Sequence, residues 1–117
     1  MNILIIINDS PYGTEKAFNA FRLANQLLKD YPESHVNIFL LADSVVCGIQ
    51  DQKTPDGYYN IGRMIKLFHA KGGQIKACES CMEARGIHPE MLQKGVQKGS
   101  MQELAKWTIE ADKEITF

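Results

Sequence analysis

The residues with the clearest capacity for chemistry are Cys78 and Cys81, which two residues separate in a C-x-x-C pattern. A thiolate is both a nucleophile and a metal ligand, and two thiols at this spacing can also form a disulfide. A structural zinc site needs a second pair of Cys or His ligands, and the sequence offers none at a suitable spacing, so we predict no metal site. Three interpretations remain: sulfur carriage as a persulfide, dithiol redox exchange, and packing of two small side chains.

Sulfur carriage as a cysteine persulfide needs an accessible thiolate near a positive charge or backbone N–H groups. Cys78 fits this need best, because Arg85 and Gly86 follow it closely and Arg85 can stabilise a thiolate. Cys81 would resolve or modulate the persulfide, since a second thiol within reach can attack it, form a disulfide and release sulfide. Cys47 lies in an apolar stretch and is expected to be a packing residue.

Two other groups of polar residues are candidates for binding. Asp9, Ser10, Tyr12 and Gly13 follow the first apolar run, where backbone donors at the start of a helix could hold an anion. The alternative is that these residues form an ordinary turn. Asp43 directly follows the second apolar run and is either a site residue or the cap of a short helix.

The overall composition restricts the partners that we expect. The chain has 117 residues, of which 44% are hydrophobic, so residues 1–117 should form one domain. A net charge of −1 predicts no nucleic-acid partner, and no apolar run has the ~18 residues of a membrane span. We expect no signal peptide, and three reduced cysteines favour a cytoplasmic protein that uses no cofactor.

Hydrophobic periodicity predicts an alternation of strands and helices. Ile3 to Ile7 is a continuous apolar run, which is typical of an interior parallel strand covered on both faces. Further strands are expected at residues 35–41, 74–77, 95–98 and 114–117, and helices at residues 15–29, 43–49, 60–70 and 101–111. Asn60 and Ser100 are the expected caps of the last two helices. This order predicts an α/β fold, namely a three-layer α/β/α sandwich with a mostly parallel sheet of about five strands.

The predicted fold also places the candidate residues. Chemistry in parallel sheets gathers at the carboxyl ends of the strands, so we expect residues 8–14, 42–49 and 78–86 to meet there, with the cysteine pair in a loop. Tyr58 and Tyr59, in a long loop, are expected to cover this site or to contact another subunit. Trp107 either contacts another subunit or packs against the sheet.

Several short motifs follow one another along the whole chain: Ser10-Pro11-Tyr12-Gly13, residues 39–45, residues 57–61, Cys78-x-x-Cys81 followed by Arg85-Gly86-Ile87, residues 103–108 and residues 111–113. In this order and spacing they resemble the DsrE/DsrF-like family, and most closely its small YchN-like members.

The resemblance implies an α/β fold and a compact oligomer, commonly a trimer or hexamer. It also implies a sulfur relay, in which a cysteine persulfide passes from a donor protein to an acceptor protein. The carrier thiol of the family corresponds to Cys78, whereas Cys81 departs from carriers with a single thiol. The protein would then be a component of a sulfurtransferase system.

Two alternatives stay open beside sulfur carriage. The first is a non-catalytic, oligomeric binding module with structural cysteines, and the second is a dithiol redox protein. Burial separates these functions, because carriage requires the Cys78 sulfur to be exposed in a cleft, whereas a binding module predicts that both sulfurs are buried.

Overall fold

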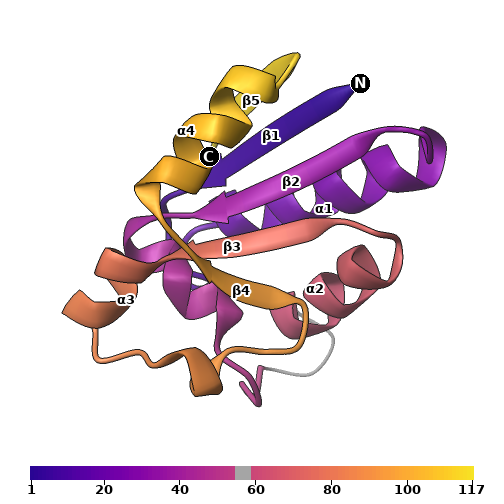
Figure 1. The fold of residues 1–117 in the computed structure, drawn as a ribbon. Coiled ribbons are helices and arrows are strands. Elements are labelled where there is room, and N and C mark those ends of the chain that lie inside the picture. The colour runs from indigo at the N-terminus through magenta and orange to yellow at the C-terminus, as the bar shows by residue number, and fades with distance from the viewer. Residues whose placement is uncertain (55–58) are drawn as a thin grey trace.

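The structure is a computed structural model that describes residues 1–54 and 59–117. The described residues form a five-stranded sheet in the order β4-β3-β2-β1-β5, in which every neighbouring pair is parallel (Figure 1). The strands are β1 (Asn2–Ile7), β2 (His35–Leu40), β3 (Gln74–Cys78), β4 (Val96–Gly99) and β5 (Lys113–Thr116). This architecture confirms the predicted α/β fold. Tyr58 lies outside the described residues.

Helices flank the sheet on both faces. They are α1 (Lys16–Asp30), α2 (Ile61–Ala70), α3 (Glu79–Ala84) and α4 (Met101–Glu110), with two short 3-10 helices, η1 (Ala42–Gly48) and η2 (Pro89–Met91). The helices α1 and α2 pack against each other on one face, and α4 lies on the other face (Figure 1). Within the described ranges, no helix is long and apolar enough to cross a membrane.

The first strand is the interior strand that its sequence predicts. It pairs with β2 on one side and with β5 on the other. Successive side chains of a strand point to opposite faces of the sheet, and Ile3, Leu4 and Ile5 are all buried, so β1 is covered on both faces. The buried core around it gives the carboxyl ends of β1, β2 and β3 a fixed frame.

Two helices begin at the residues that the sequence predicts. The Asn60 side chain accepts a hydrogen bond from the Arg63 backbone N–H at 3.0 Å, at the start of α2. Ser100 and Glu103 form a capping box at the start of α4, because each side chain accepts from the other residue's backbone N–H, at 3.2 and 3.0 Å.

Trp107 packs against the sheet, which settles the choice that the sequence left open. The Trp107 ring meets Phe39 of β2 edge-on, with 6.1 Å between the two ring centroids. Lys76 Nζ lies 4.8 Å from the centroid of the Trp107 ring. Lys76 also pairs with Glu103, so β3 is joined to the first turn of α4. These contacts bury the apolar face of α4 against the sheet.

Candidate functional site

The C-x-x-C pair lies where β3 passes directly into α3. Cys78 is the last residue of β3, and Cys81 lies in the first turn of α3. The prediction of a loop from residue 78 to residue 86 was therefore wrong, because residues 79–84 form a short helix. Residues three apart on a helical turn are neighbours, so this geometry brings the two side chains together.

Cys78 is buried, contrary to the exposure that a carrier thiol requires. Its exposed fraction is 3%. The reason is that Cys78 still pairs in register with Gly99 of β4, so its side chain follows the pleat of the sheet instead of a loop. The Cys78 thiol makes a polar contact with Ser80, whose Oγ lies 3.3 Å from Cys78 Sγ.

The surroundings of Cys78 nevertheless favour the thiolate. Burial raises the pKa of the Cys78 thiol, but the side chains of Ser80 and Cys81 and the backbone N–H groups of these two residues lower it by more. The net result is a pKa below that of an ordinary thiol. Cys78 is therefore the more acidic thiol of the pair.

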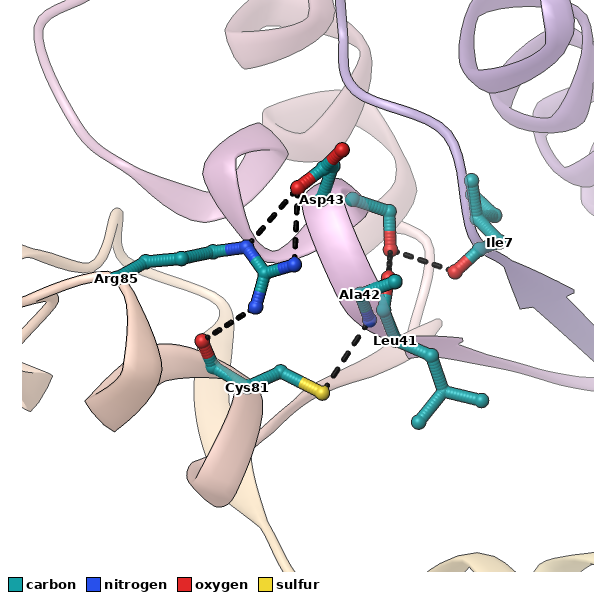
Figure 2. Close-up of polar contacts among 7 residues, drawn as sticks. Ile7, Leu41, Ala42, Asp43, Cys81 and Arg85 are labelled. Carbon is teal, nitrogen blue, oxygen red and sulfur yellow. Dashed lines mark hydrogen bonds and ion pairs between the residues drawn. The ribbon is translucent and has the colours of Figure 1, made fainter.

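Cys81 is partly exposed and has the opposite tendency. Its Sγ accepts a hydrogen bond from the Ala42 backbone N–H at 3.3 Å (Figure 2). Burial raises the pKa of the Cys81 thiol, and the neighbouring Cys78 raises it further, while the Ala42 N–H and the charge of Arg85 oppose them. Ala42 itself has a φ of +51°, a left-handed conformation that a residue with a Cβ rarely adopts, at the turn from β2 into η1.

Arg85 joins the end of α3 to the start of η1. Its Nε and Nη2 donate to Asp43 Oδ1 at 3.0 and 2.9 Å, and its Nη1 donates to the Cys81 carbonyl oxygen at 3.0 Å (Figure 2). This ion pair is open to solvent, so its value lies in geometry more than in stability. Arg85 thus stands beside Cys81, whereas we expected it to act on Cys78.

Ser44 is a residue that sequence reasoning missed. Its buried hydroxyl lies 2.5 Å from the Ile7 carbonyl oxygen and 2.6 Å from that of Leu41, and it donates to one of them at a time. It therefore holds the exits of β1 and β2 side by side. The available signal was a single hydroxyl within an apolar stretch, because a buried hydroxyl needs a hydrogen-bond partner.

The polar side chains of the turn after β1 contact residues of the same turn and Gln52. Ser10 Oγ donates to the Tyr12 carbonyl oxygen at 2.7 Å, the Thr14 hydroxyl donates to Asp9 at 2.9 Å, and the Tyr12 hydroxyl donates to Gln52 at 2.7 Å. Burial and the nearby Cys47 raise the pKa of Tyr12. The contacts of this group thus agree with the ordinary turn that was the alternative.

Gly13 and Gly86 allow left-handed backbone turns, and Cys47, the third cysteine, packs in the core. Gly13 and Gly86 have φ values of +99° and +67°, which favour glycine, and Gly86 ends α3 just after Arg85. Cys47 is buried, and burial raises the pKa of its thiol to about 12, so it stays protonated at neutral pH. The packing role predicted for Cys47 is confirmed.

The fold and the site together define a parallel α/β protein with a thiol pair at the carboxyl edge of its sheet. The model of the DsrE/DsrF-like family matches residues 1–117, and the chain belongs to that family. It is similar to Protein YchN of Escherichia coli K12, with 40% identity that covers 98% of this chain and 97% of that protein. It is also similar to the uncharacterized protein MK0008 of Methanopyrus kandleri, with 36% identity over 98% of this chain and 93% of that one.

Solved structures agree with this assignment. The crystal structure of the E. coli ychN protein has a TM-score of 0.94 at 40% identity, and the match covers 99% of this chain and 98% of that chain. The protein of unknown function MTH1491 from Methanobacterium thermoautotrophicum has a TM-score of 0.76 at 14% identity, covering 99% and 97%. The second match shows the shared fold alone.

Proposed function

We propose that this protein carries sulfur as a persulfide on Cys78 within a sulfur relay. The DsrE/DsrF-like family is associated with sulfur relay. The observation that carries the proposal is the Cys78 thiol at the carboxyl end of β3, with Ser80 Oγ 3.3 Å from its Sγ. A thiolate is the nucleophile in sulfur exchange, and the donors around Cys78 favour that form. We expect the protein to act in the cytoplasm, between a sulfur donor protein and a sulfur acceptor protein.

The transfer balances without an oxidant. The Cys78 thiolate attacks the outer sulfur of a donor persulfide R–S–SH, the S–S bond of the donor breaks, and R–S⁻ leaves. Cys78 then holds the sulfur as Cys78–S–SH. A thiolate of the acceptor attacks the same outer sulfur, removes it as a new persulfide, and restores the Cys78 thiolate.

A dithiol redox function is the second candidate, and the opposed pKa shifts of the two thiols favour it. One acidified thiol and one protonated thiol on a single turn are what a nucleophilic and a resolving cysteine require. Cys81 could also attack the inner sulfur of the Cys78 persulfide, which would form a disulfide and release HS⁻. The non-catalytic binding module agrees with the burial of Cys78, but it predicts that both sulfurs are buried, and Cys81 is partly exposed.

The test of sulfur carriage is mass spectrometry after incubation with a cysteine desulfurase and free cysteine. Trypsin releases residues 77–85 as one peptide, because Lys76 precedes it and Arg85 ends it. We expect this peptide to gain one sulfur atom, about 32 Da, which fragmentation places on Cys78. The Cys47→Ala variant is the matched control and should load like the wild type. An unlabelled protein, or label confined to Cys47, would contradict the proposal.

A further inference from the structure

We propose that Cys81 is the thiol through which sulfur enters and leaves this protein, while Cys78 is the thiol that holds it. This inference rests on the proposed function and adds a second sulfur-carrying residue to it. The substrate class is a persulfide of another protein or of a small thiol.

Access is the first argument. Transfer between two molecules requires the attacking sulfur to reach the outer sulfur of the donor, and Cys78 is only 3% exposed. Cys81 lies one turn further along the chain and is partly exposed. A donor can therefore reach Cys81 while β3 and α3 keep their positions, whereas direct attack by Cys78 would require them to move.

The polar surroundings of Cys81 are the second argument. A sulfur anion at this position receives the Ala42 N–H, which already lies 3.3 Å from Cys81 Sγ. The Arg85 guanidinium is anchored on the Cys81 carbonyl oxygen at 3.0 Å and held from its other side by Asp43. The pKa of Cys81 is raised by burial and by Cys78, and the Arg85 charge and the Ala42 N–H oppose that rise by stabilising a sulfur anion at this position. The Ala42 N–H and the Arg85 guanidinium can therefore stabilise a sulfur anion on Cys81, the exposed thiol.

The two steps balance as simple exchanges. The Cys81 thiol first loses its proton to solvent, and its thiolate attacks the outer sulfur of R–S–SH. R–S⁻ then leaves and Cys81–S–SH forms. The Cys78 thiolate then attacks the outer sulfur of Cys81–S–SH, that S–S bond breaks, and Cys81 leaves as a thiolate. One S–S bond forms as one breaks in each step, so the attacking sulfur is oxidised as the leaving sulfur is reduced, and no external oxidant is needed. Release to an acceptor is the reverse sequence.

The test compares loading rates of single-thiol variants with glutathione persulfide and with the desulfurase as donors. Reactions are quenched by alkylation, and fragmentation of the 77–85 peptide places the added sulfur. We expect Cys78→Ser to load on Cys81 at the wild-type rate, and Cys81→Ser to load Cys78 about tenfold more slowly or worse, because access limits the exchange. Cys47→Ala is again the control, and circular dichroism verifies that each variant folds.

A second variant separates access from altered acidity, since Cys81 also lowers the pKa of Cys78. Arg85→Gln, from which trypsin releases residues 77–94 instead of 77–85, should slow loading several-fold in the wild type but have no effect in the Cys81→Ser background. Arg85→Lys, which keeps the cleavage site, should retain part of the rate. Loading of Cys78 at the wild-type rate in Cys81→Ser would overturn the inference while leaving Cys78 as the carrier. Equal slowing by Arg85→Gln in both backgrounds would also overturn it. A wild-type protein that takes up no sulfur would instead overturn the proposed function itself.

Discussion

At the residue scale, three cysteines in one small chain have three different acidities because their hydrogen-bond donors differ. Cys47 is buried among apolar groups, and its pKa is raised to about 12. Cys78 is also buried, yet its pKa is lowered because Ser80 and Cys81 direct donors at it. Reactivity of a thiol is therefore decided by its polar neighbours, and exposure decides which molecules can use it.

The Ser80→Ala substitution tests this reasoning at Cys78. Removing the hydroxyl takes away the largest influence that opposes burial, so the pKa of Cys78 should rise. Because the native pKa is lowered, the wild-type Cys78 thiolate persists to a lower pH than an ordinary thiolate, and the Cys78 thiolate of the variant should be lost at a higher pH than that of the wild type. The measurement is the ¹³Cβ chemical shift of labelled Cys78 against pH, which does not depend on access to reagents.

Ser34→Ala is the matched control for this substitution. Ser34 immediately precedes β2, at the opposite end of the sheet from the site, so its loss should leave the Cys78 titration unchanged. An unchanged titration in Ser80→Ala would mean that the 3.3 Å contact between Cys78 and Ser80 does not hold the thiolate.

The cysteine pair and its place at the carboxyl edge of the sheet could be predicted from the sequence, but its surroundings could not. The spacing of Cys78 and Cys81 is visible in the chain, whereas the burial of Cys78 depends on its pairing with Gly99 in β4. The partner of Arg85 likewise depends on the turn at Ala42, which places Asp43 within reach. Contacts between segments some 40 residues apart leave no local pattern.

At the element scale, prediction succeeded where a segment had a period or a cap and failed where it had neither. The continuous run of β1 and the capping residues of α2 and α4 were all found where expected. The six residues of α3 are too few for a helical period to show, and Met82 is its one fully buried residue. A short helix of this kind is fixed by tertiary contacts, here those of Cys81 and Arg85 with η1.

The phase of α4 is set by its contacts with the sheet. Met101 is exposed, whereas Leu104 shares the inward face with Trp107 three residues later. Apolar side chains lie on two sides of this helix, so its sequence alone allows two phases. The contacts of Trp107 with Phe39 and Lys76 select one of them.

Ser100→Ala tests the contribution of the cap that starts α4. The substitution removes the acceptor of the Glu103 N–H, so the free energy of unfolding should fall by about 1 kcal/mol. Urea titration measures this change, and Ser100→Thr, which keeps a hydroxyl, should restore most of it. Equal stability of the Ala and Thr variants would contradict the role of the Ser100 hydroxyl.

Lys76 and the Ser100 N–H lower the pKa of Glu103, so the stabilisation from Glu103 is present at neutral pH and is lost as the pH falls through that lowered pKa.

At the scale of the whole molecule, the topology explains why one edge of the sheet collects the polar contacts. All strands run in parallel, so the exits of β1, β2 and β3 lie next to one another, and Ser44, Ala42 and Cys81 connect them in that order. This juxtaposition could be expected from the alternation of strands and helices alone. The pairing of individual side chains across it could not.

The outer surface of α4 leads to a prediction about assembly. Ile109 is 87% exposed, and Met101 and Ala105 lie on the same side of the helix at spacings of four residues, so an apolar stripe faces solvent in the single chain. The family resemblance implies a homo-oligomer, and we expect copies of this chain to cover that stripe. Light scattering should therefore give a mass three or six times the 13.2 kDa of one chain.

Ile109→Lys should lower that mass, because a charge in an apolar contact must be desolvated without a partner. Leu67→Lys is the matched control, since Leu67 is 51% exposed but lies on α2, on the opposite face of the sheet. We expect it to leave the mass unchanged. A wild-type mass of one chain at micromolar concentration would contradict the prediction of an oligomer, and equal dissociation by both variants would contradict the assignment of the contact to α4.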